Sequence, residues 1–253
     1  MTTISKANHT DLVRKTLLAK LTYGEYYPGH RFVLRELLQD PEFEGMSQTP
    51  IREALLQLVA ANILIGQRGF SVRVPIPSAE HLIEVRALRS HLEVMAALQH
   101  FDDWDKESLL ELEALHHSMM QAKSIKDVKN QLRYNALFHM RLCHMEHESY
   151  LKSMIQTLWA ITGPSVGYLY DKGSTSVFTG IHPHDEILKA LREKNARLLE
   201  QALIKDLSST GMRIIEVLKQ KLSPEALALQ PFKPMDLVRV RTREGRQIKY
   251  GAN

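Results

Sequence analysis

The stretch from Met46 to Pro75 runs a helical pattern into two β-prone segments, an order that few small folds accommodate. Ser47 has the side chain of a helix N-cap, and Pro50 lies in the first turn, where a missing N–H removes no hydrogen bond. Apolar side chains then recur at helical spacing, at Ile51, Leu55, Leu58 and Val59. The pattern predicts a helix that ends at Asn62 and leads into a hairpin.

The predicted hairpin has two short strands around a basic tip. Ile63 to Ile65 and Phe70 to Val74 are the β-prone segments, and Gly66-Gln67-Arg68-Gly69 is the turn between them. A tip that carries Arg68 suits a DNA phosphate or the minor groove.

The helix before the hairpin has a polar face at its N-terminal end. Gln48, Thr49 and Arg52 gather there, where a major-groove recognition helix makes its base and phosphate contacts. The combination of this helix with a basic hairpin predicts a DNA-binding function.

This stretch resembles the winged helix-turn-helix of the GntR family of bacterial transcription regulators. The family signature runs P-G, L-R-x-E-L and S-R-T-P-V-R-E-A-L, followed by a wing that contains glycine. The chain has Pro28-Gly29, Leu34-Arg35-Glu36-Leu37, Ser47 to Leu55 and Arg68-Gly69 in these places. The resemblance implies that the DNA-contacting residues are Arg35, Ser47, Gln48, Thr49, Arg52, Arg68 and Gly69.

Two features depart from the signature. Gln48 replaces the usual Arg, which bears on the operator sequence because Gln pairs with adenine edges and Arg with guanine edges. The segment from Leu38 to Met46 is a few residues longer than the usual turn, which bears on the tilt of the recognition helix.

The composition places the chain among soluble globular proteins. Its 253 residues and 44% hydrophobic content favour two domains or one large one. The formal charge is +4, and its basic excess lies at the two ends of the chain. Cys143 is the single cysteine, and we find neither a membrane-spanning run nor a signal peptide, so we expect a cytoplasmic protein without disulfides.

Local signals divide the chain into a DNA-binding domain at residues 10–75 and a second domain at 79–222. We expect residues 1–9 to be disordered, Thr10 to cap a first helix and Arg31 to Leu38 to form a second. Pro75-Ile76-Pro77 marks a stiff break, with residues 76–78 as the linker, and Ser78 caps a helix that runs to about His100.

The second domain shows apolar stripes at helical spacing and no convincing strand. We expect an all-α bundle of six or seven helices, with breaks at Gly163-Pro164, at Gly173 to Thr175 and at Asn195. The fold class is therefore mainly α, with a winged helix-turn-helix at the N-terminus. Residues 223–253 form a basic tail that is either a small hairpin or frayed, with at most an auxiliary role.

The second domain resembles the FCD domain, the effector domain of the FadR-type branch of the GntR family. Arg86 and Arg89-Ser90-His91-Leu92-Glu93 stand where that branch has its R-x-x-L-E opening. The resemblance implies that this domain dimerises and binds a small organic acid or related metabolite. Arg86 or Arg89 could pair with its carboxylate, together with His139 and His184, although an Arg89–Glu93 ion pair is the alternative for Arg89.

In many members of this branch a metal is held by an Asp, a His four residues later and two further His. The matching residues here are Asn135, His139, His184 and Asp206, so two of the four donors are changed. Two His and one carboxylate can still bind a divalent ion such as zinc. A polar chamber without a metal is an equally open alternative. The close spacing of His182 and His184 we interpret as a chance surface placement.

These features predict a ligand-responsive repressor that binds a palindromic operator as a homodimer through two winged helices. One alternative is a DNA-binding dimer without an effector. Another is a metal-dependent enzyme built on the helical bundle, but we find no nucleophile–base pair, phosphate-binding Gly loop or H-E-x-x-H motif to support it. We therefore expect a protein that is not an enzyme.

Overall fold

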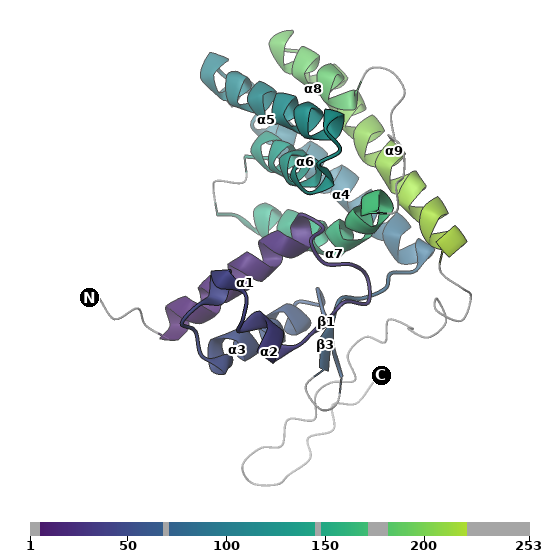
Figure 1. Cartoon of the computed structure of the whole chain (residues 1–253). Coiled ribbons are helices and arrows are strands. Elements are labelled where there is room, and N and C mark those ends of the chain that lie inside the picture. Colours follow the sequence, from purple (N-terminus) through teal and green to yellow (C-terminus); the bar gives the residue numbers. More distant parts are fainter. Residues whose placement is uncertain (1–5, 68–70, 145–147, 172–181, 222–253) are drawn as a thin grey trace, which may run out of the picture.

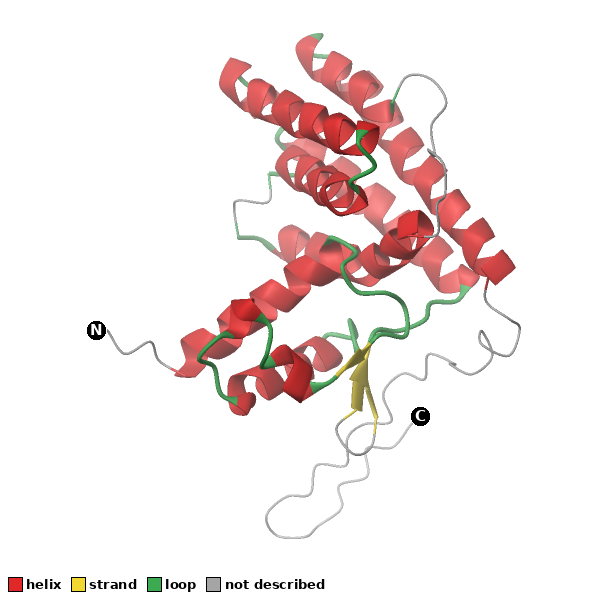
Figure 2. Cartoon of the chain, in the orientation of Figure 1, coloured by secondary structure: helices red, strands yellow, loops and turns green. Residues whose placement is uncertain are grey.

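The computed structural model of the chain describes residues 6–67, 71–144, 148–171 and 182–221. Helices make up most of this part of the chain, which also contains a three-stranded antiparallel sheet (Figure 1, Figure 2). The predicted fold class, mainly α with a small β wing and an all-α C-terminal part, is confirmed. Among the described residues, no helix has the length and apolar character needed to span a membrane.

The N-terminal part is built on three helices, α1 (Lys6–Thr22), α2 (Leu34–Leu37) and α3 (Gln48–Ala60). Their apolar faces meet in one core, which includes Val13, Leu17, Leu21, Leu37, Ile51, Leu55 and Leu58. Each such side chain contributes roughly 1.5–3 kcal/mol when it is fully buried. This core fixes the position of α3 against α1 and leaves the other face of α3 to solvent.

The first helix begins earlier than the predicted cap. Thr10 is buried inside α1, and its hydroxyl donates to the Glu53 carboxylate of α3 at 2.9 Å. Residues 6–9 are helical, so the prediction of disorder over residues 1–9 is wrong for them. Residues 1–5 lie outside the described residues.

The turn between α2 and α3 is ordered by contacts of its own. It contains a short 3-10 helix, η1 (Pro41–Phe43), which places Phe43 fully buried in the core. Lys20 of α1 holds the turn through Nζ, which lies 2.6 Å from Asp40 Oδ2 and 2.8 Å from Glu42 Oε2. The residues that lengthen this turn therefore tie the start of α3 to α1.

The sheet has three strands in the order β1-β3-β2: β1 (Arg31–Phe32), β3 (Ser71–Arg73) and β2 (Ile65–Gln67). Phe32 of β1 and Gly66 of β2 both pair with Val72 in the central strand. The prediction of a helix from Arg31 to Leu38 is thus wrong at its start. Residues 31–32 pair with a strand far along the chain, which no local pattern reveals.

Six helices form the C-terminal part of the described chain: α4 (Ala79–Gln99), α5 (Lys106–Ser124), α6 (Val128–Leu142), α7 (Tyr150–Asp171), α8 (Pro183–Arg192) and α9 (Ala196–Lys221). A short 3-10 helix, η2 (Phe101–Asp103), joins α4 to α5. Ser78 caps α4 as predicted, since its hydroxyl accepts a hydrogen bond from the His81 N–H. The predicted loop at Gly173 to Thr175 and the tail at 223–253 lie outside the described residues.

The predicted break at Gly163-Pro164 is wrong, because α7 continues through Pro164 as one helix. A proline inside a helix loses one backbone hydrogen bond, and tight packing of α1 on α7 accompanies that loss here. A Cβ atom added to Gly163 would lie 2.2 Å from the Leu21 carbonyl oxygen, and one added to Gly167 would lie 2.3 Å from that of Gly24. The two glycines therefore let the end of α1 touch the backbone of α7.

Candidate ligand chamber and DNA-binding face

The described members of the predicted DNA-binding set are all exposed: Arg35, Ser47, Gln48, Thr49 and Arg52. They lie on α2 and the start of α3, which pack against each other. Ser47 occupies the N-cap of α3 without a side-chain cap hydrogen bond, while Pro50 and Ile51 anchor the opposite face in the core. Arg68 and Gly69 lie outside the described residues.

A cavity of about 50 Å³ lies between four helices of the C-terminal part, α4, α6, α7 and α9. Its walls consist of Leu82, Arg86, Arg89, Asn135, His139, Trp159, Thr162, Val166, Asp206, Leu207 and Ile214. A space of this size holds roughly three or four water molecules. In this arrangement it fits a small ligand of only a few heavy atoms. We call it the ligand chamber.

Four charged side chains form a continuous buried chain along the chamber. Arg89 Nε donates to Glu93 Oε1 at 2.7 Å, and the other Glu93 oxygen lies 3.0 Å from His139 Nδ1. His139 Nε2 lies 2.9 Å from Asp206 Oδ2. The charges alternate in sign from Arg89 to Asp206, so each buried charge has an opposite neighbour.

The pKa values of this chain follow from burial and pairing. Burial alone would lower the pKa of His139, but hydrogen bonds with Asp206 and Glu93 outweigh it and raise the pKa to about 9. Burial alone would raise the pKa of Asp206, yet the hydrogen bond with His139 brings it down to about 2. At neutral pH His139 is therefore an imidazolium held between two carboxylates.

The two arginines at the chamber differ in the number of contacts that their side chains make. Arg89 bonds Glu93, lies 3.3 Å from the Thr162 hydroxyl and stacks 3.8 Å from the Trp159 ring centre. The Arg89–Glu93 ion pair, left open as an alternative to ligand binding, is present. Arg86 is half-buried and reaches the Ser208 carbonyl oxygen at 3.4 Å. Arg86 is thus the arginine that can turn toward an incoming anion at the smaller cost.

Three of the proposed metal donors converge at one end of the chamber. His184 Nε2 lies 3.4 Å from His139 Nε2 and 3.8 Å from Asp206 Oδ2, and the three residues each offer one donor atom within 4.8 Å of the others. Asn135 lies one turn before His139 on α6 and lines the same chamber.

The donor chemistry fits a divalent transition metal. Two imidazoles and a carboxylate are typical zinc ligands, and Glu93 would orient His139 through Nδ1, as acidic groups do for metal-bound histidines. An ion there must displace the proton that His139 Nε2 shares with Asp206.

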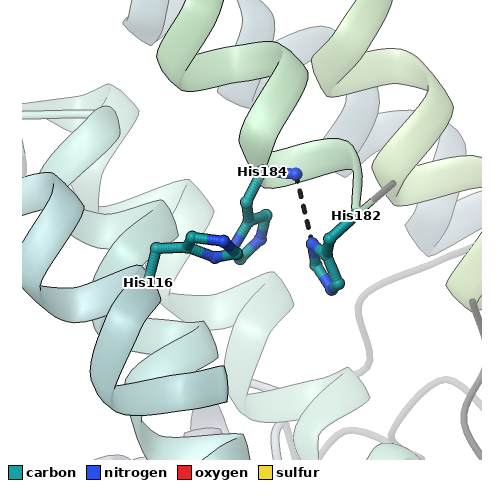
Figure 3. A group of neighbouring side chains, drawn as sticks. All are labelled: His116, His182 and His184. Atoms are coloured by element: carbon teal, nitrogen blue, oxygen red, sulfur yellow. Dashed lines mark hydrogen bonds between the residues drawn. The ribbon is translucent and has the colours of Figure 1, made fainter. Parts of the chain in front are cut away.

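The interpretation of His182 and His184 as surface residues is wrong, because both are buried. His182 is the N-cap of α8, and its Nδ1 accepts a hydrogen bond from the His184 N–H at 3.2 Å. His116 of α5 is buried beside them, with its ring centre 5.4 Å from that of His184 (Figure 3). Sequence reasoning missed His116, since only the packing of α5 on α8 brings it near the other two.

Comparisons with known proteins find one match to the helical C-terminal part and others that cover most of the chain. Residues 84–209 match the model of the FCD domain family. The chain is 31% identical over 194 residues to the HTH-type transcriptional regulator McbR of Escherichia coli, covering 75% of this chain and 86% of that protein.

Solved structures extend the likeness to most of the fold. E. coli McbR/YncC superimposes with a TM-score of 0.73 at 29% identity, over 86% of this chain and 98% of that one. A GntR protein from Rhodococcus sp. RHA1 gives a TM-score of 0.65 at 19% identity, over 82% of this chain and 97% of that one. At that identity the second likeness shows the shared fold alone.

Proposed function

The chain belongs to the GntR family of transcription regulators, in the branch with an FCD domain, and from this premise we propose that it is a repressor released from its operator by a small carboxylate bound in the ligand chamber. Its relatives are DNA-binding regulators and not enzymes. The proposal adds the direction of regulation, the ligand class and the route by which the ligand acts.

The observation that carries the proposal is the double role of α7. Trp159, Thr162 and Val166 of α7 line the chamber, while Gly163 and Gly167 on another face touch the backbone at the end of α1. Because the contact joins two backbones, no flexible side chain lies between the helices to absorb a displacement of α7. A ligand that shifts α7 therefore shifts α1, and with it the reading helix α3 that packs on α1.

A carboxylate is the ligand class that the charges favour. The buried chain from Arg89 to Asp206 is already neutralised pair by pair, so Arg86 is the cation with spare bonding capacity at the chamber wall. A guanidinium binds a carboxylate through two parallel hydrogen bonds. Asn135, which also lines the chamber, offers a further polar contact.

We propose that His139, His184 and Asp206, with Asn135 beside them, hold a divalent ion such as zinc when one is supplied. Such an ion would supply positive charge to a ligand carboxylate. Because His139 must lose a proton first, its occupancy falls as the pH is lowered.

We propose that the residues that contact the operator are Arg35, Ser47, Gln48, Thr49, Arg52, Arg68 and Gly69. One short helix contacts few base pairs, so we propose a cytoplasmic homodimer whose two winged helices occupy the halves of a palindrome. Phosphate contacts make operator binding weaken steeply with salt, because they release condensed counterions.

A constitutive DNA-binding dimer is a second candidate, and one observation favours it. The His139 imidazolium already supplies positive charge between Glu93 and Asp206, so the chamber is electrically balanced without any ligand or ion. In that case the chamber would stabilise the fold and transmit nothing to α3.

One titration separates the two candidates. Operator DNA is selected from a random pool by the purified protein, and small mono- and dicarboxylates are then added to the complex. The proposal predicts release by at least one acid, with release lost in Arg86→Gln and kept in the control Arg197→Gln, which changes an exposed arginine away from the chamber. Complexes that withstand every acid, or release that is unchanged in Arg86→Gln, would count against the proposed effector site.

A further inference from the structure

Three histidine rings meet beside the ligand chamber, at the junction of α5 and α8 (Figure 3). The ring centre of His182 lies 4.5 Å from that of His184 and 5.6 Å from that of His116. Each ring offers one nitrogen, and the three nitrogens lie within 4.8 Å of one another. All three side chains are buried, with exposed fractions of 8% for His116, 9% for His182 and 0% for His184.

Two of these rings carry a buried nitrogen that the described protein leaves unsatisfied. Nδ1 of His116 and Nδ1 of His184 have no hydrogen-bond partner among the described residues. A buried polar atom without a partner destabilises the folded protein, because it has lost its hydrogen bonds to water. Such atoms are rare in native cores, and an ion bound by these ring nitrogens would satisfy both of them.

One hydrogen bond at His116 and one at His182 show which ring nitrogens have lone pairs to offer. His116 Nε2 lies 3.1 Å from Asp185 Oδ1, and since a carboxylate only accepts, the proton belongs on Nε2 and the lone pair on Nδ1. His182 Nδ1 accepts from the His184 N–H at 3.2 Å, so this nitrogen also carries a lone pair. A metal ion that binds this lone pair would replace the hydrogen bond from the His184 N–H.

The electrostatic surroundings keep these rings neutral. Burial lowers the pKa of His116, lowers that of His182 to about 4 and lowers that of His184 well below its ordinary value. Asp185 and Asp206 oppose the effect without overcoming it.

We propose that His116, His182 and His184 form a binding site for a divalent transition-metal ion that prefers imidazole ligands, such as Zn²⁺, Ni²⁺ or Cu²⁺. Three imidazoles leave a fourth position for water. A tetrahedral ion at about 2.1 Å from each nitrogen needs nitrogens roughly 3.4 Å apart, so side-chain movements of about 1 Å close the site. Asp185 orients His116 from behind, as carboxylates do for metal-bound histidines.

This site differs from the one at His139 and Asp206, although both contain His184. The Nε2 atom of His184 faces His139, while its Nδ1 is the unsatisfied atom of the three-imidazole cluster. The cluster has no carboxylate donor, and Nδ1 of His116 and of His184 have no partner among the described residues, whereas His139 Nε2 already lies 2.9 Å from Asp206 Oδ2. A metal ion therefore meets less competition at the three-imidazole site.

The test is a cobalt titration of the full-length protein after chelator treatment and removal of the chelator. Co²⁺ bound by three imidazoles gives visible absorption bands, and elemental analysis gives the stoichiometry. His116→Gln and His182→Asn should weaken cobalt binding and change the bands, because only the donor set of His139, His184 and Asp206 then remains intact. Asp185→Asn should weaken cobalt binding by roughly 10- to 100-fold, as expected for an orienting carboxylate. The control His117→Gln, an exposed neighbour on α5, should bind cobalt as the unchanged protein does.

A second pair of variants distinguishes the two sites. Asp206→Asn and His139→Gln remove donors of the other set, and the proposal predicts that both retain the cobalt bands. Loss of the bands in Asp206→Asn together with their retention in His116→Gln would place the ion in the other set and overturn the proposal. Unchanged protein that binds no cobalt would overturn it as well. Circular dichroism of the metal-free variants checks that each one is folded.

Discussion

Replacing Gly163 by alanine has two opposite effects on the free energy of unfolding. Alanine has a higher helix propensity than glycine by about 1 kcal/mol in a helix interior, so α7 alone would be stabilised. The added Cβ, however, would lie 2.2 Å from the Leu21 carbonyl oxygen and 2.6 Å from that of Thr22. Both are backbone atoms at the end of α1, so no side chain can rotate away.

The magnitude follows from the size of the required displacement. An unstrained Cβ contact is longer than 3.0 Å, so α1 and α7 must separate by roughly 1 Å. Overpacking of this kind costs about 1–3 kcal/mol, and a rigid backbone neighbour puts the cost at the upper end. After the gain in propensity is subtracted, we expect Gly163→Ala to destabilise the protein by about 1–2 kcal/mol.

The assay is urea unfolding monitored by circular dichroism, with operator affinity measured on the same samples. Gly167→Ala repeats the test, because its Cβ would lie 2.3 Å from the Gly24 carbonyl oxygen. Ser153→Ala, at an exposed position of α7, is the control for an alanine substitution in this helix without the contact to α1. A Gly163→Ala protein more stable than the unchanged chain would show that α1 and α7 do not touch as described, and the route from chamber to DNA would lose its basis.

Three further predictions concern the chamber and the reading face. The pKa of His139 is raised to about 9, so its stabilising contribution is complete below pH 6.5 and lost as pH rises through 9; metal-free protein should lose about 3 kcal/mol of unfolding free energy over this range, and His139→Gln should not. A flat profile for the unchanged chain would contradict the buried imidazolium. Arg52→Ala and Arg35→Ala should each weaken operator binding by roughly 1–3 kcal/mol in a gel-shift titration while melting as the unchanged protein does; undiminished affinity would move the reading face elsewhere. Asn135→Asp should tighten zinc binding at His139 and Asp206 by adding a negative donor, which calorimetry would detect, and an unchanged affinity would exclude Asn135 from that site.

Helices with strong local signals could be predicted from the sequence. The stripe from Ile51 to Val59 and the cap at Ser78 act within a few residues, and α3 and α4 lie where these signals place them. The strand at residues 31–32 depends on pairing with Val72, and the continuity of α7 depends on its packing against α1. Neither dependence is visible in a window of the sequence.

The same holds for the ligand chamber, where features within one helix could be predicted and contacts between helices could not. Asn135 and His139 are four residues apart on one helix, so a common direction follows from helix geometry. Glu93 could be foreseen as a partner of its neighbour Arg89, but its second bond, to His139, joins two helices that are distant in sequence. The burial of His116 and His182 likewise arises from the packing of α5 on α8.

The coupling between chamber and operator is measured most directly by titrating the releasing carboxylate into free protein and into the protein–operator complex. Linkage requires that an acid which weakens operator binding by a given factor itself binds the complex more weakly by the same factor. We predict a ratio between the two dissociation constants of roughly 5 to 150, the usual range for coupled sites. Equal dissociation constants would mean that the chamber and the reading helices act independently, contradicting transmission through α7.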